Sequence, residues 1–119
     1  MFYTVKQLDW RKGDIIDREM RLDLCDGRVT DPDTLALMIS FMAEAYQKVA
    51  VIQLVAGPVE DGLEECFVRT NSIDAPWFES NDPILRLKTR TRSTSVGDIV
   101  RVGGHTYYCA SVGWIKVSD

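Results

Sequence analysis

Residues 31–55 read DPDTLALMISFMAEAYQKVAVIQLV, and the pattern within them decides the fold class. Asp31 supplies an N-cap and Pro32 suits the first helical position. The apolar residues that follow recur at helical spacing, which predicts an amphipathic helix from Pro32 to Lys48. The β-branched run Val49–Val55, which a Gly-Pro pair ends, predicts a central strand directly after the helix.

Further elements are expected on both sides of this unit. Phe2–Leu8 alternates as a strand does, whereas residues 9–30 fit either a helix or a strand that ends at Asp26-Gly27. The remaining predicted elements are a short helix at about 61–70, strands at Ile84–Thr94, Ile99–Val102, His105–Ala110 and Trp114–Val117, and a tight hairpin at Gly103-Gly104. We therefore expect one α+β domain over residues 1–119, with a mixed or antiparallel sheet.

The amino-acid composition and net charge limit the kinds of function that we expect. The chain has 119 residues, of which 45% are apolar and 27% charged, as in an ordinary globular domain. Its net charge of −4 argues against a protein that coats nucleic acid by overall charge. The sequence contains neither a membrane-spanning apolar run nor a signal peptide, so we expect a cytoplasmic protein with no membrane partner.

The sequence offers few candidates for catalysis or metal binding. His105 and Cys109 lie four apart on a predicted strand, and Cys25 or Cys66 is a conceivable further zinc ligand. No C-x-x-C pair supports such a site, and the three cysteines resemble buried free thiols. The paired carboxylates fall at helix starts and turns. We therefore predict no catalytic residues, no metal and no cofactor.

A row of cations is the clearest candidate for binding. Arg86, Lys88, Arg90 and Arg92 occupy alternate positions of a predicted strand, with about 6.6–7 Å between successive charges. Such a row suits an acidic protein surface or a phosphate backbone. It is equally typical of an edge strand that charge protects from aggregation. Aromatic residues that could stack beside it are Trp77, Phe78 and Trp114.

Three segments carry a family resemblance: LEECFVRTNSIDAPWF (63–78), RSTSVGDIV (92–100) and HTYYCASVGWIKV (105–117). Together they resemble the YodL-like group of small proteins from phages, plasmids and bacterial mobile elements. The resemblance covers about the last half of the chain and implies a cytoplasmic accessory protein with no established enzymatic activity. The motif positions to which we assign a structural role are Arg92, Ser93, Ser95, Gly97, Asp98, Gly113 and Trp114.

The RSTSVGD core also has a direct physical interpretation. We expect Ser93 and Ser95 to offer oxygens to the turn backbone, Gly97 to supply a positive φ, and Asp98 to accept backbone N–H groups. Arg92 is expected to pair with Asp98 or with the carboxylates at residues 64–65, which would remove it from the binding row.

The leading expectation is a non-enzymatic module that docks on, and can inhibit, a host macromolecule. Its predicted contacts are Arg86, Lys88 and Arg90, with Trp77 as an anchor, and its expected partner is the acidic protein surface of a host factor. One alternative is a nucleic-acid-binding module that uses the same row. Another is an enzyme or a ligand-sequestering protein with a pocket between the methionine-rich helix and the sheet. The oligomeric state is not predicted.

Overall fold

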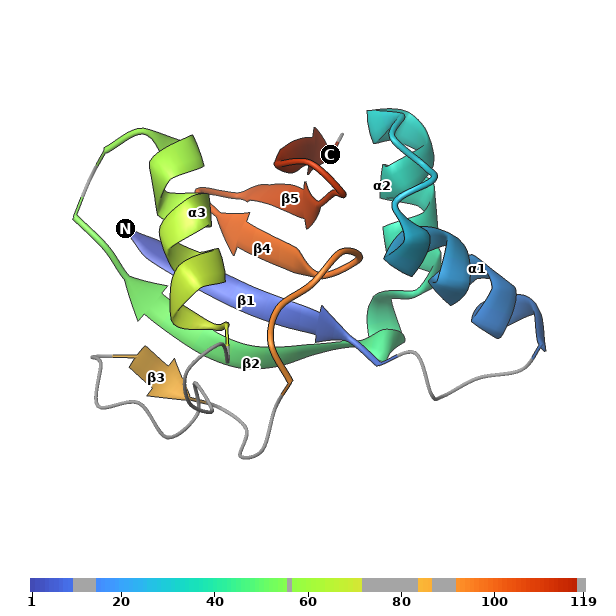
Figure 1. Ribbon diagram of the computed structural model, residues 1–119, viewed down its shortest axis with the longest axis horizontal. Coiled ribbons are helices and arrows are strands. Elements are labelled where there is room, and N and C mark those ends of the chain that lie inside the picture. The colour runs from blue at the N-terminus through green and yellow to red at the C-terminus, as the bar shows by residue number, and fades with distance from the viewer. Residues whose placement is uncertain (10–14, 56, 72–83, 87–91, 118–119) are drawn as a thin grey trace.

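A computed structural model describes residues 1–9, 15–55, 57–71, 84–86 and 92–117. In these segments six strands form one sheet in the order β3-β2-β1-β4-β5-β6, and all neighbouring strands are antiparallel (Figure 1). The predicted α+β class is confirmed. The elements are β1 (Phe2–Leu8), α1 (Ile15–Asp26), α2 (Pro32–Phe41), β2 (Tyr46–Gln53), α3 (Val59–Arg69), β3 (Ile84–Arg86), β4 (Ile99–Val102), β5 (His105–Cys109) and β6 (Trp114–Val117).

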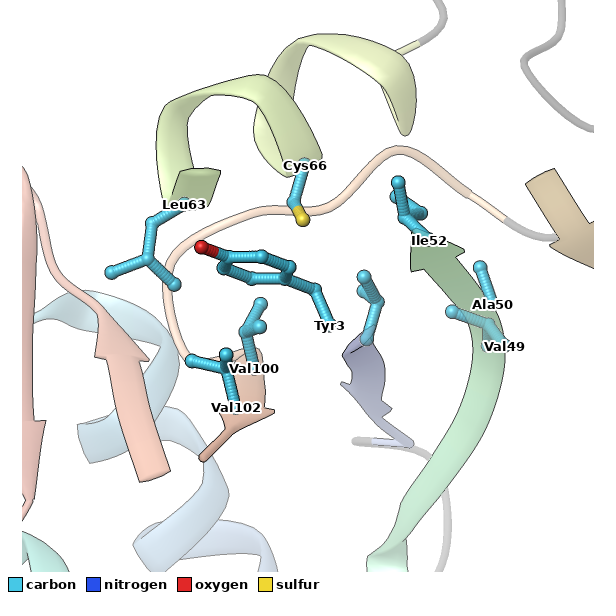
Figure 2. Packing of buried hydrophobic residues seen from close by; sticks show 9 residues of the cluster. Tyr3, Val49, Ala50, Ile52, Leu63, Cys66, Val100 and Val102 are labelled. Atoms are coloured by element: carbon cyan, nitrogen blue, oxygen red, sulfur yellow. The ribbon is translucent and has the colours of Figure 1, made fainter. Parts of the chain in front are cut away.

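One face of the sheet is covered by α3. Because side chains alternate along a strand, Tyr3 and Val5 of β1 point to this face and are almost fully buried. Figure 2 shows the Tyr3 ring beneath α3, beside Leu63 and Cys66. Burial of each such side chain contributes roughly 1.5–3 kcal/mol to folding, so this layer is one half of the hydrophobic core.

A glycine lets α3 lie this close to the sheet. A Cβ atom added at Gly62 would sit 2.1 Å from the Tyr3 hydroxyl oxygen and 2.3 Å from the ring carbon that bears it. Since Tyr3 is 1% exposed, its ring has no room to move aside. Gly62 therefore sets the separation between α3 and β1.

The other face packs against α1 and α2. Its core includes Leu8 from β1, Leu24 from α1 and Leu35 from α2. Asp31 caps α2 by accepting a 2.8 Å hydrogen bond from the Thr34 backbone N–H, and Pro32 opens the helix as predicted. In Figure 1, α2 extends from beside the dark red C-terminal strand towards the start of β2.

The predicted helix from Pro32 to Lys48 is too long. Helix α2 ends at Phe41, a 3-10 turn spans Ala43–Ala45, and β2 begins at Tyr46, three residues before the predicted strand. Tyr46–Lys48 pair with Lys6–Leu8 of β1, and the buried Tyr46 hydroxyl donates to the Gly97 carbonyl at 2.6 Å. These long-range bonds outweigh the local helical periodicity, which sequence alone shows.

A β-bulge in β2 decides which of its residues face α2. Val5 pairs with Ala50 but Lys6 pairs with Lys48, so Val49 is an extra residue on β2. Val49 and Ala50 are both buried in the core under α3. As a result Lys48 lies directly opposite Lys6 on the α2 side of the sheet.

The predicted bounds of the remaining helices and strands agree with the structure in part. Strands Phe2–Leu8, Ile99–Val102 and Trp114–Val117 are confirmed, and the Gly103-Gly104 hairpin has positive φ at both glycines. The helical alternative holds within residues 9–30, as α1. The short helix begins two residues earlier than predicted and ends at Arg69, and the β5 strand ends at Cys109 rather than Ala110.

The predicted strand Ile84–Thr94 is wrong at its far end. Only Ile84–Arg86 forms a described strand, and residues 92–95 lie outside any strand, while residues 87–91 fall outside the described residues. None of the helices in the described segments has the length and apolar character that crossing a bilayer requires.

Candidate functional site

The RSTSVGD turn is built around a buried ion pair. The Asp98 side chain is completely buried, and its two oxygens accept hydrogen bonds from Arg92 Nη1 at 2.6 Å and Nη2 at 2.7 Å. The same carboxylate accepts backbone N–H groups from Ser95 at 2.8 Å and from Leu8 at 2.9 Å. Asp98 therefore joins the turn to the end of β1.

The guanidinium of Arg92 completes this structural unit. It also donates to the Leu8 carbonyl at 2.8 Å and to the Ser93 carbonyl at 3.0 Å. Burial alone would lower the pKa of Arg92, but the hydrogen bonds and negative charge of Asp98 outweigh burial and raise it. Of the two pairings open in the sequence, Arg92 forms the one with Asp98, and it does not belong to the predicted row of cations.

The other motif residues have mainly backbone roles. Gly97 has a φ of 100°, and a Cβ atom there would lie 3.2 Å from the Cys25 backbone, so the turn and α1 approach closely. Ser95 Oγ accepts from Arg92 Nη1 at 3.2 Å rather than from the turn backbone. Gly113 has a φ of 70°, and the half-buried Trp114 donates from Nε1 to Glu64 at 3.2 Å.

The predicted binding row can be placed only at one residue. Arg86 lies on β3, the edge strand of the described sheet, at the position opposite Ala50. Lys88, Arg90 and the predicted anchor Trp77 fall outside the described residues. The row therefore remains a prediction, and its fourth position, Arg92, was assigned to the strand wrongly.

The thiols are in surroundings that suppress ionisation. Burial raises the pKa of both Cys66 and Cys109 to about 12, and it also raises that of the half-buried Cys25. A nucleophilic cysteine needs the opposite shift. His105 lies at the hairpin end of β5, and within the described part of the chain no three His, Cys, Asp or Glu side chains group as metal ligands would.

A groove of about 720 Å³ lies between α2 and the sheet, and we call it the α2 groove. Its roof is formed by Asp33, Ala36, Leu37, Ile39, Ser40 and Ala43. Its floor is formed by Lys6, Tyr46, Ile99, Arg101, Thr106 and Val117. It lies where the ligand-pocket alternative expected one, although the methionines of α2 do not line it.

The floor of the α2 groove crosses the sheet. Its residues come from β2, β1, β4, β5 and β6, which are consecutive neighbours in the sheet. Since adjacent strands lie about 4.8 Å apart, the floor is about 19 Å long across four intervals. The groove is therefore elongated, and its ends differ in chemistry.

Three cations lie on the adjacent strands β2, β1 and β4, and we call Lys6, Lys48 and Arg101 the cation cluster. Lys6 lines the groove on β1, Lys48 is directly opposite on β2 beside the groove, and Arg101 lies diagonally across on β4. Burial lowers the pKa of Lys6, and the positive charges of Lys48 and Arg101 lower it further. Like charges at such positions repel one another.

The cation cluster has no carboxylate partner among the residues that the structure describes. Arg101 Nη1 donates to Thr106 Oγ1 at 2.7 Å, which holds the guanidinium above the floor. Among the described residues that line the groove, Asp33 is the one acidic residue. The site therefore presents fixed positive charge to whatever enters it.

Sequence reasoning missed this site because its residues are spread over the chain. Lys6 and Arg101 interrupt the apolar pattern of short strands, and that is the only local signal they give. Their pairing with Lys48 depends on the bulge at Val49. No family model, curated protein or solved structure matches this chain at a significant level.

Proposed function

We propose that this chain is a non-enzymatic binding protein that holds a small organic anion in the α2 groove. The observation that carries the proposal is the position of Lys6 and Arg101 on the groove floor, with Lys48 beside them and no ion pair to a described carboxylate. The groove volume, about 720 Å³, falls in the range of roughly 300–1,000 Å³ that small-molecule sites occupy.

Physical chemistry favours an anion with an apolar part. An entering negative charge relieves the repulsion within the cation cluster, so binding gains more there than at an isolated lysine. Arg101 donates one N–H group to Thr106, and its other N–H groups can donate to a carboxylate, sulfonate or phosphate. The apolar side chains of Leu37, Ile99 and Val117 suit the rest of such a ligand.

The test is a titration with 8-anilinonaphthalene-1-sulfonate, an apolar anion whose fluorescence rises on binding. We expect saturable binding by the folded protein, weakened about tenfold or more by Lys6→Gln and by Arg101→Gln. The matched control is Lys116→Gln, which removes one exposed positive charge from β6 at a position paired with Tyr107, outside the groove. Equal affinity in all four proteins would refute the proposed site.

Macromolecular docking by the segment Arg86–Arg90 is the second candidate. It is favoured by the edge position of β3, which leaves one side of that strand unpaired in the described sheet. An acidic protein surface is its proposed partner, and nucleic acid is the alternative. Its phage or mobile-element setting rests on the YodL-like resemblance alone. Its cytoplasmic location rests on that resemblance and on the sequence pattern, and both stay predictions.

A further inference from the structure

We infer that the ligand of the α2 groove is a phosphate monoester, with its dianionic phosphate at the cation cluster and an uncharged, largely apolar body extending beneath α2. This inference rests on the proposed function and adds the charge, shape and orientation of the ligand. It depends on three observations: three cations lie on adjacent strands, no described ion pair joins them to Asp33, and neutral residues line the groove between Asp33 and the cluster.

The three cations lie on three adjacent strands of the sheet. Lys6 is on β1, and its partners Lys48 and Arg101 lie on the strands to either side. Side chains directly opposite have Cβ atoms about 4.5–5.5 Å apart, and diagonal neighbours lie about 7–8 Å apart. Long basic side chains rooted at such distances can reach different oxygens of a single tetrahedral group.

The charge of the cluster matches a dianion better than a monoanion. A carboxylate or sulfate ester would neutralise one of three positive charges and leave the other two repelling each other. A phosphate monoester carries nearly two negative charges at neutral pH and presents three acceptor oxygens. It can therefore pair with Lys6 and Arg101 together while Lys48 offsets the residual charge.

Asp33 makes no ion pair with the cluster in the described part of the chain. It is in the first turn of α2, whereas the other end of the helix leads through Ala43–Ala45 into β2. Figure 1 shows the start of α2 beside the C-terminal strand β6. That strand is two intervals, or about 10 Å, from β4 with Arg101, and three intervals, or about 14 Å, from β1 with Lys6. Asp33 instead disfavours a second negative group at the β6 end of the ligand.

Between these ends the α2 groove offers neutral surface. Leu37 and Ile39 of α2 face a floor that includes Ile99 and Val117. The hydroxyls of Ser40 and Thr106 are the polar exceptions, and Thr106 can still donate its own proton because it serves Arg101 as an acceptor. A ligand body of mixed but mainly apolar character fits this middle section.

The experiment compares four probes with the same six-carbon chain by isothermal titration: hexyl phosphate, hexyl sulfate, heptanoate and hexylmalonate. We expect hexyl phosphate to bind at least about tenfold more tightly than the other three. Its affinity should fall as the pH drops below about 6, where the phosphate dianion takes up one proton and becomes a monoanion, while that of hexyl sulfate stays constant. Inorganic phosphate, which lacks a body, should bind more weakly than hexyl phosphate.

Variants locate the phosphate. Lys48→Gln should weaken hexyl phosphate several-fold but change hexyl sulfate little, and Asp33→Asn should not weaken hexyl phosphate. Lys116→Gln is the charge-matched control, and urea unfolding checks that each variant is folded. A large loss with Asp33→Asn would place the phosphate at the wrong end and overturn the inference.

The outcomes separate the two proposals. If hexyl sulfate, heptanoate or hexylmalonate binds as tightly as hexyl phosphate, and Lys6→Gln weakens that binding, the phosphate inference is wrong while the proposed function stands. If inorganic phosphate binds as tightly as hexyl phosphate, the assignment of a body beneath α2 is wrong. If no probe binds saturably, both proposals fail.

Discussion

Asp98 is completely buried, and both of its carboxylate oxygens are held by the Arg92 guanidinium, at 2.6 and 2.7 Å. The pair connects two parts of the sheet, because the same carboxylate accepts the Leu8 N–H and the same guanidinium donates to the Leu8 carbonyl. The charged side chains of the RSTSVGD motif therefore stabilise the fold.

Removal of the Asp98 carboxylate should lower the stability of the protein more than most single substitutions do. Asp98→Ala leaves the Arg92 guanidinium without its partner and two backbone N–H groups without acceptors. We expect a loss of about 3–5 kcal/mol in the free energy of unfolding, measured in urea. The control is Arg28→Ala, which breaks the exposed 3.6 Å pair with Asp26 and should cost less than about 1 kcal/mol. Similar losses for the two variants would contradict the assigned role.

Gly62→Ala should destabilise the protein although alanine favours helices. The added methyl group would overlap the buried Tyr3 ring, and we expect a loss of about 1–3 kcal/mol in thermal or urea unfolding. Val68→Ala, at an exposed site of the same helix, should be nearly neutral. Because the clash involves Tyr3, the cost of Gly62→Ala should shrink in a Tyr3→Val background. Strict additivity of the two changes would refute the close contact.

Stability should fall in alkaline solution. Burial raises the pKa of Cys66 and Cys109 from 9.0 to about 12, so the folded state holds protons that the unfolded state releases. A raised folded-state pKa gives stability that is complete below pH 9 and is lost towards pH 12. The slope in that range approaches about 1.4 kcal/mol per pH unit for each thiol.

The measurement is the free energy of unfolding in urea at about pH 8 and about pH 10.5. Cys66→Ala should be less stable than the wild type at the lower pH, because a buried group is truncated, but should lose less on going to the higher one. The variant removes one of the titrating thiols and leaves Cys109 in place. Parallel pH profiles for the variant and the wild type would show that Cys66 does not titrate as its burial requires.

Docking by the edge segment predicts loss of a partner on charge reversal. The variant with Arg86, Lys88 and Arg90 all changed to Glu should fail to retain a partner that the wild type retains from bacterial lysate. The matched control changes the exposed Arg18, Arg28 and Lys116 to Glu and should retain it. If nucleic acid is the partner, affinity should fall with salt at a log–log slope of about −2 to −3. Identical partners for all three proteins would exclude the segment as a docking site.

Sequence reasoning succeeded where local chemistry dictates structure. The alternation of Phe2–Leu8, the Asp31 cap and the paired glycines at 103–104 each determine their element with little help from the rest of the chain. It failed at Tyr46–Lys48, where pairing with β1, about forty residues away along the chain, outweighs the helical spacing. Local periodicity carries no information about such a partner.

The candidate site was beyond sequence reasoning for a related reason. Lys6, Lys48 and Arg101 become neighbours only after three strands align, and one inserted residue, Val49, decides that Lys48 faces the same way as Lys6. The Arg86–Arg90 row was visible because its members are close in sequence. Proximity in sequence and convergence in space are different properties, and binding depends on the second.

The short connection after α2 also fixes the position of one end of this helix relative to the sheet. Helix α2 passes into β2 through the single 3-10 turn Ala43–Ala45, in which Ala45 is buried and accepts a 2.8 Å hydrogen bond from the Asp9 N–H. This contact ties the end of α2 to the residue that follows β1, so backbone contacts set the spacing between helix and sheet at this end of the α2 groove.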